Sequence, residues 1–142
     1  MQKVLRSKEM SKCLGCFTCM NVCASFNHKN HSLRKSAIKV RTTGGMSSRY
    51  IAIVCLGCAE PACREVCPSD ALDLRESGGV LLVPDKCIGC RLCETNCIMR
   101  AVNFDEETKK PIICRHCGVC ANFCPHDCLQ MVEAEEVSVY VE

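Results

Sequence analysis

The stretch Cys-Ile-Gly-Cys-Arg-Leu-Cys-Glu-Thr-Asn-Cys, residues 87–97, holds four cysteines in the spacing C-x2-C-x2-C-x3-C. The same spacing occurs at residues 13–23 and 114–124, and residues 55–67 follow it with two extra residues, as C-x2-C-x4-C-x3-C. Sixteen of the 17 cysteines belong to these four groups. The chain therefore contains a fourfold internal repeat whose most constant feature is its sulfur donors.

This spacing suits a cubane iron-sulfur cluster. Three thiolates two residues apart on a tight loop can converge on one [4Fe-4S] cube, and in two-cluster ferredoxins the fourth cysteine ligates the neighbouring cube. A glycine recurs in each loop, where a missing Cβ lets the backbone approach inorganic sulfide closely. These glycines are Gly15, Gly57, Gly89 and Gly118. The four groups therefore predict four [4Fe-4S] clusters.

Three other uses of clustered cysteines compete with this interpretation. Zinc knuckles usually have two C-x2-C pairs separated by about twelve or more residues, which make one four-thiolate site. A disulfide framework is typical of small secreted chains with an even number of cysteines, whereas this chain has 17. A metallothionein-like coil would lack the Val, Ile and Leu that recur between the groups. A zinc-holding interaction module is the rival from a different functional class.

Composition limits the rest of the molecule. The 142 residues are enough for one domain, or for two small fused lobes that share a core. The chain has no Trp, two Tyr and four Phe, so an ordinary aromatic core is not expected. Ligand bonds would supply much of the folding free energy, and we expect the apoprotein to be largely unfolded.

Charge argues against a nucleic-acid partner. The formal net charge is +2 with neutral thiols. A cluster with four thiolate ligands carries about −2 in its 2+ state, so four clusters bring the holoprotein to about −6. Phosphate binding needs positive patches. One cation lies in or beside each group and could stabilise reduced clusters, dock an acidic partner or simply solubilise the surface: Lys12, Arg64, Arg91 and Arg115.

The sequence also predicts where the protein works. No stretch approaches the roughly 18 consecutive apolar residues of a membrane span. Residues 1–8 contain neither an apolar signal region nor a twin-arginine pair. Many unpaired thiols point to a reducing compartment. We therefore expect a cytoplasmic protein of an anaerobe or facultative anaerobe, without a membrane span.

Between the cysteine groups the chain predicts hairpins. Residues 71–74 and 80–83 flank a Gly-Gly turn, and residues 101–104 and 111–113 flank a charged turn. In the long basic spacer 24–54, residues 37–42 and 49–54 flank Gly44-Gly45, which predicts a projecting hairpin. Its cations could grip an acidic partner or simply be solvated. Residues 132–142 predict an edge strand that closes this fold or a neighbour's sheet.

Two residues near the fourth group need separate interpretation. Cys128 occupies the repeat position of Ala71 and Ala101, so we interpret it as a small buried residue and not as a ligand. His116 lies inside a group whose cysteine set is already complete, and we expect it to hydrogen-bond a cluster or face water.

The chain offers no substrate chemistry of its own. It has no catalytic dyad, no phosphate-binding loop and no nucleotide fingerprint, because Gly44-Gly45 and Gly78-Gly79 lack the G-x-G-x-x-G spacing. The sequence therefore predicts a subunit that carries electrons and is not an enzyme by itself.

The four groups, with the second widened between its second and third cysteines, resemble the iron-sulfur electron-transfer subunits of the dimethyl sulfoxide reductase and formate dehydrogenase type. The resemblance covers residues 13–125. It implies that the first and fourth groups share one pair of clusters and that the second and third share the other. The implied ligand sets are Cys13, Cys16, Cys19 with Cys124; Cys114, Cys117, Cys120 with Cys23; Cys55, Cys58, Cys63 with Cys97; and Cys87, Cys90, Cys93 with Cys67. The spacing alone also permits a tandem pairing of the first group with the second and the third with the fourth.

One departure from this family is informative. Its large members have a long insertion between the second and third cysteines of the fourth group, whereas here Cys117 and Cys120 follow the short spacing. This compact form is most similar to the small subunits of tungsten enzymes of the aldehyde ferredoxin oxidoreductase family, including benzoyl-coenzyme A reductases. The resemblance implies a larger catalytic partner with a tungsten or molybdenum cofactor. It also implies a ferredoxin or FAD/NAD-binding partner, or end-to-end self-association.

The resulting expectation is an α+β fold of two fused bacterial-type 2×[4Fe-4S] ferredoxin-like lobes, with short antiparallel hairpins and short helices around the clusters. Residues 1–142 would form one polyferredoxin domain, with lobe one from 1–54 plus 110–142 and lobe two from 55–109. A free-standing polyferredoxin, or an electron subunit of a hydrogenase or formate dehydrogenase, remains an alternative function.

Overall fold

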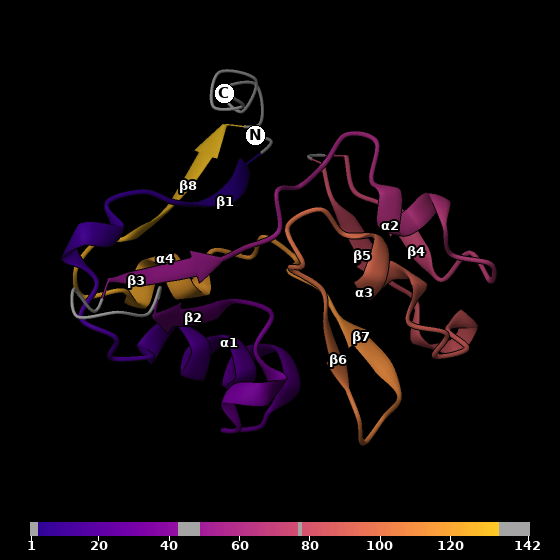
Figure 1. The fold of residues 1–142 in the computed structure, drawn as a ribbon, viewed down its shortest axis with the longest axis horizontal. Coiled ribbons are helices and arrows are strands. Elements are labelled where there is room, and N and C mark those ends of the chain that lie inside the picture. The colour runs from indigo at the N-terminus through magenta and orange to yellow at the C-terminus, as the bar shows by residue number, and fades with distance from the viewer. Residues whose placement is uncertain (1–2, 43–48, 77, 134–142) are drawn as a thin grey trace.

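The computed structural model describes residues 3–42, 49–76 and 78–133 (Figure 1). The fold is a small α+β arrangement of short strand pairs and few helices, as expected. Its elements are β1 Lys3–Ser7, α1 Thr18–His28, β2 Lys39–Thr42, β3 Tyr50–Ile53, α2 Ala62–Glu65, β4 Leu72–Leu74, β5 Val80–Leu82, α3 Leu92–Asn96, β6 Asn103–Asp105, β7 Lys110–Ile112, α4 Val119–Phe123 and β8 Leu129–Glu133. Single 3-10 turns lie at Met10–Lys12, Leu33–Lys35 and Pro84–Lys86.

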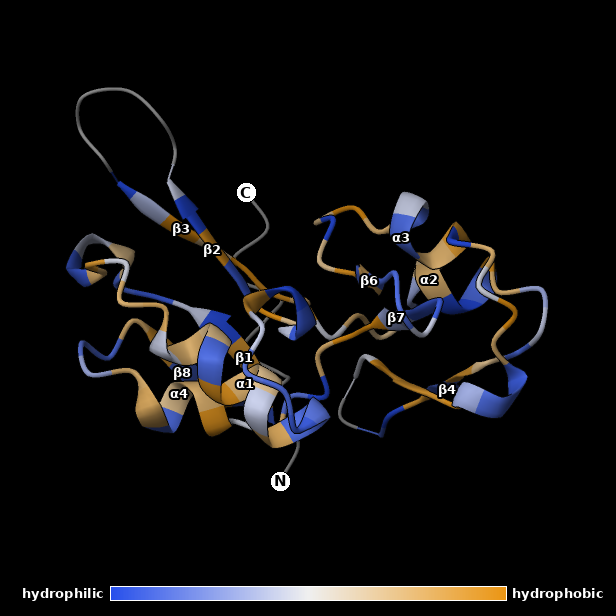
Figure 2. Cartoon of the chain, turned by 90° about the horizontal axis from the view of Figure 1, so that it is seen from below, coloured by the Kyte–Doolittle hydropathy of each residue, from blue (hydrophilic) through white to orange (hydrophobic). Residues whose placement is uncertain are grey.

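The three predicted hairpins are confirmed as antiparallel pairs. In β2–β3 Lys39 lies opposite Ile53, in β4–β5 Leu72 lies opposite Leu82, and in β6–β7 Asn103 lies opposite Ile112. Figure 2 shows β2 and β3 reaching away from the body of the molecule, with hydrophilic residues at their outer end. The predicted turn at Gly44-Gly45 lies outside the described residues.

A fourth strand pair joins the two ends of the described chain. Strand β1 pairs antiparallel with β8, with Leu5 opposite Met131. The strand expected at 132–142 instead begins at Leu129, and residues 134–142 lie outside the described range. Val4 and Leu5 are each 1% exposed. Strand β1 has no sequence signal of its own, because its two adjacent apolar residues show no alternation. Strand β8 closes this fold through a long-range contact with β1.

The elements lie in two sets (Figure 1). One set contains β1, α1, β2, β3, α4 and β8, and the other contains α2, β4, β5, α3, β6 and β7. Each set has its own buried cluster, one around Leu5 and Ile38 and the other around Leu72 and Val80. Strand β7 lies at the boundary between the sets: it pairs with β6, and its Ile112 packs in the cluster around Leu5 and Ile38. The division into two ferredoxin lobes stays a prediction.

A left-handed residue starts three of the helices. Phe17, Arg91 and Gly118 have φ of 57°, 65° and 80°, and each directly follows the second cysteine of its group. The backbone turns sharply there and enters a helix whose first turn carries the third cysteine. The fourth cysteine follows at i+4, within α1 for Cys23 and directly after the last helical residue for Cys97 and Cys124. The two cysteines of each pair are therefore about 6 Å apart along the helix axis.

No helix within the described residues is long and apolar enough to cross a membrane.

Candidate iron-sulfur cluster sites

Four cavities each bring together four cysteines from two different groups. In every cavity three cysteines come from one group and the fourth comes from another. We name them the first end cavity (Cys13, Cys16, Cys19, Cys124), the first inner cavity (Cys114, Cys117, Cys120, Cys23), the second inner cavity (Cys55, Cys58, Cys63, Cys97) and the second end cavity (Cys87, Cys90, Cys93, Cys67). All sixteen predicted site residues line these cavities, in the sets that the resemblance implies. Iron ligation by these sets stays a prediction.

The helices connect each end cavity to its inner neighbour. On α1, Cys19 lines the first end cavity and Cys23 lines the first inner cavity. Cys120 and Cys124 link the same two cavities in the opposite direction through α4, which packs on α1. Segments α2 and α3 repeat this exchange between the second inner and second end cavities. The C-x3-C spacing therefore spans two neighbouring cavities.

Backbone amides donate to the sulfurs of the fourth cysteines. The N–H groups of Ala71, Ala101 and Cys128 donate to Cys67, Cys97 and Cys124, with N to Sγ distances of 3.3, 3.4 and 3.4 Å. In each turn the residue before the donor is left-handed, with φ between 51° and 53°. Cys23 instead accepts from Ala37 N–H at 3.4 Å. Such bonds stabilise a thiolate ligand and tune the metal that it holds.

Burial disfavours the free thiolate of several cysteines in these cavities, whereas hydrogen bonds lower the pKa of Cys16 and, where they outweigh burial, that of Cys67. Burial raises the pKa of Cys19, Cys63 and Cys93 to about 11 and that of Cys120 to about 12. Burial also raises the pKa of Cys114 to about 12; the His116 N–H opposes this increase, and the nearby Cys55 thiol adds to it. Bound iron would supply the positive charge that buried thiolates need. The donor set and its amide partners therefore fit iron-sulfur clusters.

The zinc interpretation requires a different geometry. A structural zinc ion needs four donors within about 2.3 Å of one point. Across residues 3–42, 49–76 and 78–133, no three His, Cys, Asp or Glu side chains form a group that could hold a metal ion in this way. The absorption near 400 nm that iron-sulfur clusters show distinguishes the two kinds of site.

Cys128 lines the first end cavity together with the four predicted ligands. Its side chain is buried, and its Sγ lies 3.8 Å from the His126 carbonyl oxygen. The first end cavity therefore has five cysteines, and the interpretation of Cys128 as a packed small residue stays a prediction.

His116 does not face water, contrary to one of the two outcomes expected for it. Its side chain is 5% exposed, and its Nδ1 accepts a hydrogen bond from Leu5 N–H at 2.9 Å. Burial, followed by the charges of Arg75 and Arg6, lowers the pKa of His116 to about 4, so the ring is neutral near pH 7. The sequence contained one signal for this residue, because His116 directly precedes the second cysteine, where the other three groups have glycine.

Two of the four predicted cluster-side cations have acidic partners. Lys12 pairs with Glu9. Arg91 pairs with Glu106, and its guanidinium carbon lies 4.1 Å from the centre of the Phe104 ring. Arg64 and Arg115 are exposed. These contacts favour a structural role for Lys12 and Arg91.

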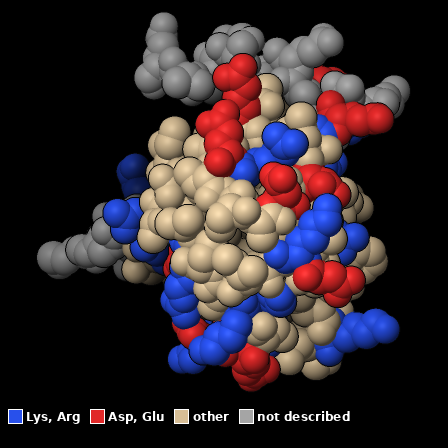
Figure 3. All heavy atoms as spheres, turned by 90° about the vertical axis from the view of Figure 1, so that its right-hand side faces the viewer, with Lys and Arg blue, Asp and Glu red and all other residues tan. Residues whose placement is uncertain are grey.

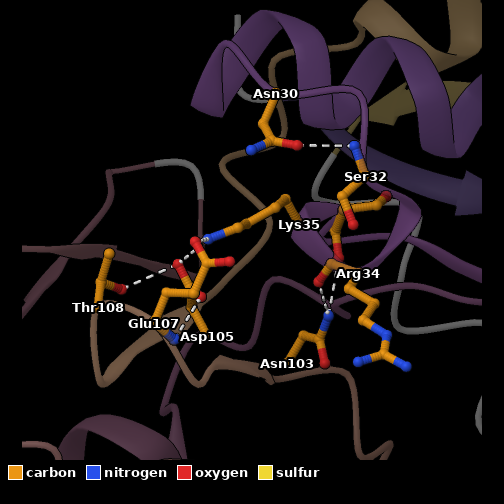
Figure 4. Close-up of polar contacts among 9 residues, drawn as sticks. Asn30, Ser32, Arg34, Lys35, Asn103, Asp105, Glu107 and Thr108 are labelled. Atoms are coloured by element: carbon orange, nitrogen blue, oxygen red, sulfur yellow. Dashed lines mark hydrogen bonds and ion pairs between the residues drawn. The ribbon is translucent and has the colours of Figure 1, made fainter.

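A polar network links the long basic spacer to the β6–β7 hairpin (Figure 4). Lys35 Nζ lies 2.7 Å from Asp105 Oδ2 and 3.0 Å from Glu107 Oε2, and Thr108 Oγ1 donates to Asp105 at 2.9 Å. The Asn103 amide donates to the Arg34 carbonyl at 2.7 Å. Lys35 thus joins the two sets of elements and is not available to grip an acidic partner.

Comparisons with known proteins identify relatives. No protein-family model matches the chain. The chain is 30% identical over 149 residues to the Escherichia coli protein named probable anaerobic dimethyl sulfoxide reductase chain YnfG, which covers 91% of this chain and 73% of that protein. It is 32% identical over 126 residues to an uncharacterized ferredoxin of Methanocaldococcus jannaschii, covering 88% of this chain and 70% of the ferredoxin.

A third relative is much longer. The chain is 30% identical over 132 residues to the beta subunit of NADH-dependent phenylglyoxylate dehydrogenase of Aromatoleum evansii. The match covers 89% of this chain but spans 30% of that subunit. With the cysteine-lined cavities, these similarities show that the chain belongs to the family of ferredoxin-like iron-sulfur electron-transfer subunits of oxidoreductases.

Proposed function

We propose that this protein passes single electrons along four [4Fe-4S] clusters, one in each cavity, between a larger catalytic subunit and a second redox partner. The observation that carries the proposal is the exchange of cysteines within two pairs of cavities, the first end with the first inner cavity and the second inner with the second end cavity. The loops of the two inner cavities lie against each other, because a Cβ at Gly57 would lie 3.2 Å from His116 Nε2. Lobe one would carry the first two clusters and lobe two the last two.

The residues around the cavities suit this function. When bound, each cluster would supply one-electron redox chemistry. Val40, Leu129 and Ala52 line the first end cavity, and Val80, Val102 and Ile113 line the second inner cavity. Apolar walls limit the access of water, and amide N–H groups directed at sulfur favour the more negative reduced state.

Both ends of the series reach the surface. The second cysteine of every group is exposed, in the inner cavities as well as at the ends. At the two ends the apolar residues Leu14 and Ile88 are also exposed, at 69% and 68%. Figure 3 views the end of the molecule that carries α2 and α3 and shows an uncharged area bordered by basic and acidic side chains. We propose that one end contacts the catalytic subunit and the other contacts a ferredoxin, an FAD/NAD-binding subunit or a second copy of this chain.

For the catalytic partner we propose a tungsten enzyme of the aldehyde oxidoreductase type, or a molybdenum enzyme. The short fourth group supports this choice. Anaerobic co-purification followed by tungsten and molybdenum analysis tests it. A hydrogenase partner would instead bring nickel. A formate dehydrogenase partner would be recognised by the identity of the catalytic subunit that co-purifies.

The similarity to a ferredoxin favours one second candidate, a free-standing polyferredoxin. The native mass of the purified protein separates the two functions. A mass near the 15.7 kDa of this chain supports a free carrier, and a stable larger assembly supports a subunit.

Anaerobic preparation tests the clusters themselves. We expect about sixteen iron atoms per chain, absorption near 400 nm, and paramagnetism at low temperature after reduction with dithionite. Colourless protein with bound zinc would contradict the proposal and support the zinc module.

Replacement of one ligand tests the electron path. In Cys93→Ser, and likewise in Cys19→Ser, we expect damage to one cube and loss of electron delivery, while substrate binding by the catalytic partner is unchanged. Thr95→Ser, in the same helix as Cys93, is the control and should retain normal turnover. Normal turnover of Cys93→Ser with the physiological acceptor would show that electrons do not follow this series.

A further inference from the structure

The His116 backbone adopts a conformation that the other loops give to glycine. The residue before the second cysteine is Gly15, Gly57 or Gly89 in three groups, with φ of 71°, 65° and 72°. His116 occupies the same place with φ of 53°. A side chain in this region is disfavoured for residues other than glycine, so the imidazole is kept at a conformational cost.

The hydrogen bonds of His116 show which nitrogen of its imidazole ring carries the proton. His116 Nδ1 accepts a hydrogen bond from Leu5 N–H at 2.9 Å, so Nδ1 holds no proton and the proton of the ring lies on Nε2. Within the described residues, Nε2 is the one buried side-chain nitrogen or oxygen that lacks a hydrogen-bond partner. A buried donor without an acceptor is unfavourable in a folded protein, which indicates that it interacts with a group outside the polypeptide.

The Nε2 edge of the ring lies against the loop of the neighbouring inner cavity. A Cβ at Gly57 or at Gly79 would lie 3.2 or 3.3 Å from Nε2. Gly57 is between Cys55 and Cys58, and Gly79 lines the second inner cavity and donates its N–H to the Cys58 carbonyl at 3.0 Å. The two glycines therefore leave space for the ring between the inner cavities.

His116 also belongs to the loop of the first inner cavity. Its backbone N–H lies 3.4 Å from Cys114 Sγ. The residue thus contacts one inner set of cysteines through its backbone and faces the loop of the other through its side chain.

We propose that His116 is a positioning residue that couples the two inner clusters: Nδ1 fixes the ring to β1, and the Nε2–H dipole stabilises the charge that the second inner cluster gains on reduction. The inference rests on the proposed electron-transfer function. One electron from a donor such as dithionite enters the cluster, and His116 keeps its proton throughout. Removing the N–H should therefore make this cluster harder to reduce.

Two amide variants separate the roles of the two ring nitrogens. His116→Gln keeps a donor near the position of Nε2, and His116→Asn keeps a polar group near Nδ1 but does not reach the second loop. His31→Gln is the matched control, because His31 is exposed. All proteins are prepared anaerobically with their clusters, and redox titration followed by electron paramagnetic resonance measures each potential. Cys63→Ser identifies the signal of the second inner cluster by its loss.

We expect every His116 variant to keep about sixteen iron atoms. In His116→Asn the ratio of reduced to oxidised second inner cluster should fall at least tenfold at a fixed potential, about 59 mV for one electron. His116→Gln and His31→Gln should stay close to the wild type. His116→Gly, which restores the loop pattern, should also alter the magnetic interaction between the reduced inner clusters.

Unchanged potentials in His116→Asn, equal shifts in all four clusters, or loss of the second inner cluster from both amide variants would overturn the proposal for His116. The proposed function would stand in those cases, because the wild type would still contain four clusters. A wild type with far fewer than about sixteen iron atoms would overturn the function and this inference together.

Discussion

Cys124 and Cys128 lie one turn apart and line the same cavity, but we expect only Cys124 to bind iron. The amide of Cys128 donates to Cys124 Sγ, as the amides of Ala71 and Ala101 do to Cys67 and Cys97. The other two residues at this position are alanines, whose side chains have no donor atom. The position therefore does not need a ligand, and we expect the Cys128 thiol not to be one.

This difference is testable by a matched pair of variants. Cys128→Ala should keep about sixteen iron atoms per chain, whereas Cys124→Ala should lose up to about four. Colorimetric iron analysis of anaerobically purified protein measures both. Loss of a whole cluster from Cys128→Ala would show that the fifth cysteine is a ligand.

At the scale of elements, the β4–β5 hairpin supports a cluster loop that is distant in the sequence. Gly78 has φ of 91°, and a Cβ there would overlap the carbonyl oxygen of Gly57. The next residue, Gly79, donates its N–H to the Cys58 carbonyl. The Gly-Gly turn therefore both reverses the hairpin and packs against the loop of the second inner cavity.

Gly78→Ala should disturb that loop without touching a cysteine. The positive φ alone costs about 1–3 kcal/mol, and the overlap adds to it. We expect faster loss of the second inner cluster in urea, measured by the decrease in absorption near 400 nm. Glu76→Ala, an exposed change in the same turn, is the control. Equal rates of loss for the two variants would show that the turn does not support the loop.

At the scale of the whole molecule, Lys35 and Asp105 link the two sets of elements through a pair whose carboxylate is 9% exposed. The hydrogen bonds to Asp105 and Glu107 raise the pKa of Lys35 above its ordinary value of 10.5. The ion pair therefore stabilises the folded protein fully below pH 10.5, the ordinary pKa of lysine. This stabilisation is lost as the pH rises through the raised pKa of Lys35 in the folded protein. Burial would raise the pKa of Asp105, but the bonds from Lys35, Glu107 and Thr108 outweigh it and lower the pKa.

Lys35→Ala should lower the midpoint of thermal unfolding, with a similar decrease at pH 7 and pH 9. The difference from the wild type should shrink above pH 10.5, where the wild-type pair also loses its charge. Anaerobic calorimetry measures it, with Lys86→Ala as the exposed control. A difference that is equally large well above that pH would mean that the ion pair is not its cause.

Local features of this fold were predictable because they depend on neighbouring residues. The three hairpins follow from turn residues between short apolar runs, and the candidate donors follow from a spacing that repeats four times. Strand β1 was not predicted, because its pairing with β8 joins the two ends of the described chain. The ion pair between Lys35 and Asp105 was not predicted, because the two residues lie 70 positions apart in the sequence.

The amino-acid sequence by itself determined the donor chemistry of this protein: sixteen cysteines in four groups, with the third and fourth cysteine of each group separated by three residues. The spacing left the pairing of the groups open, and the family resemblance implied it. Only the tertiary structure decided which cysteines share a cavity and that His116 is buried between two loops, with its ring held by Leu5, 111 residues away. The physical reason is that spacing constrains residues a few positions apart, whereas these contacts form only when distant segments pack together.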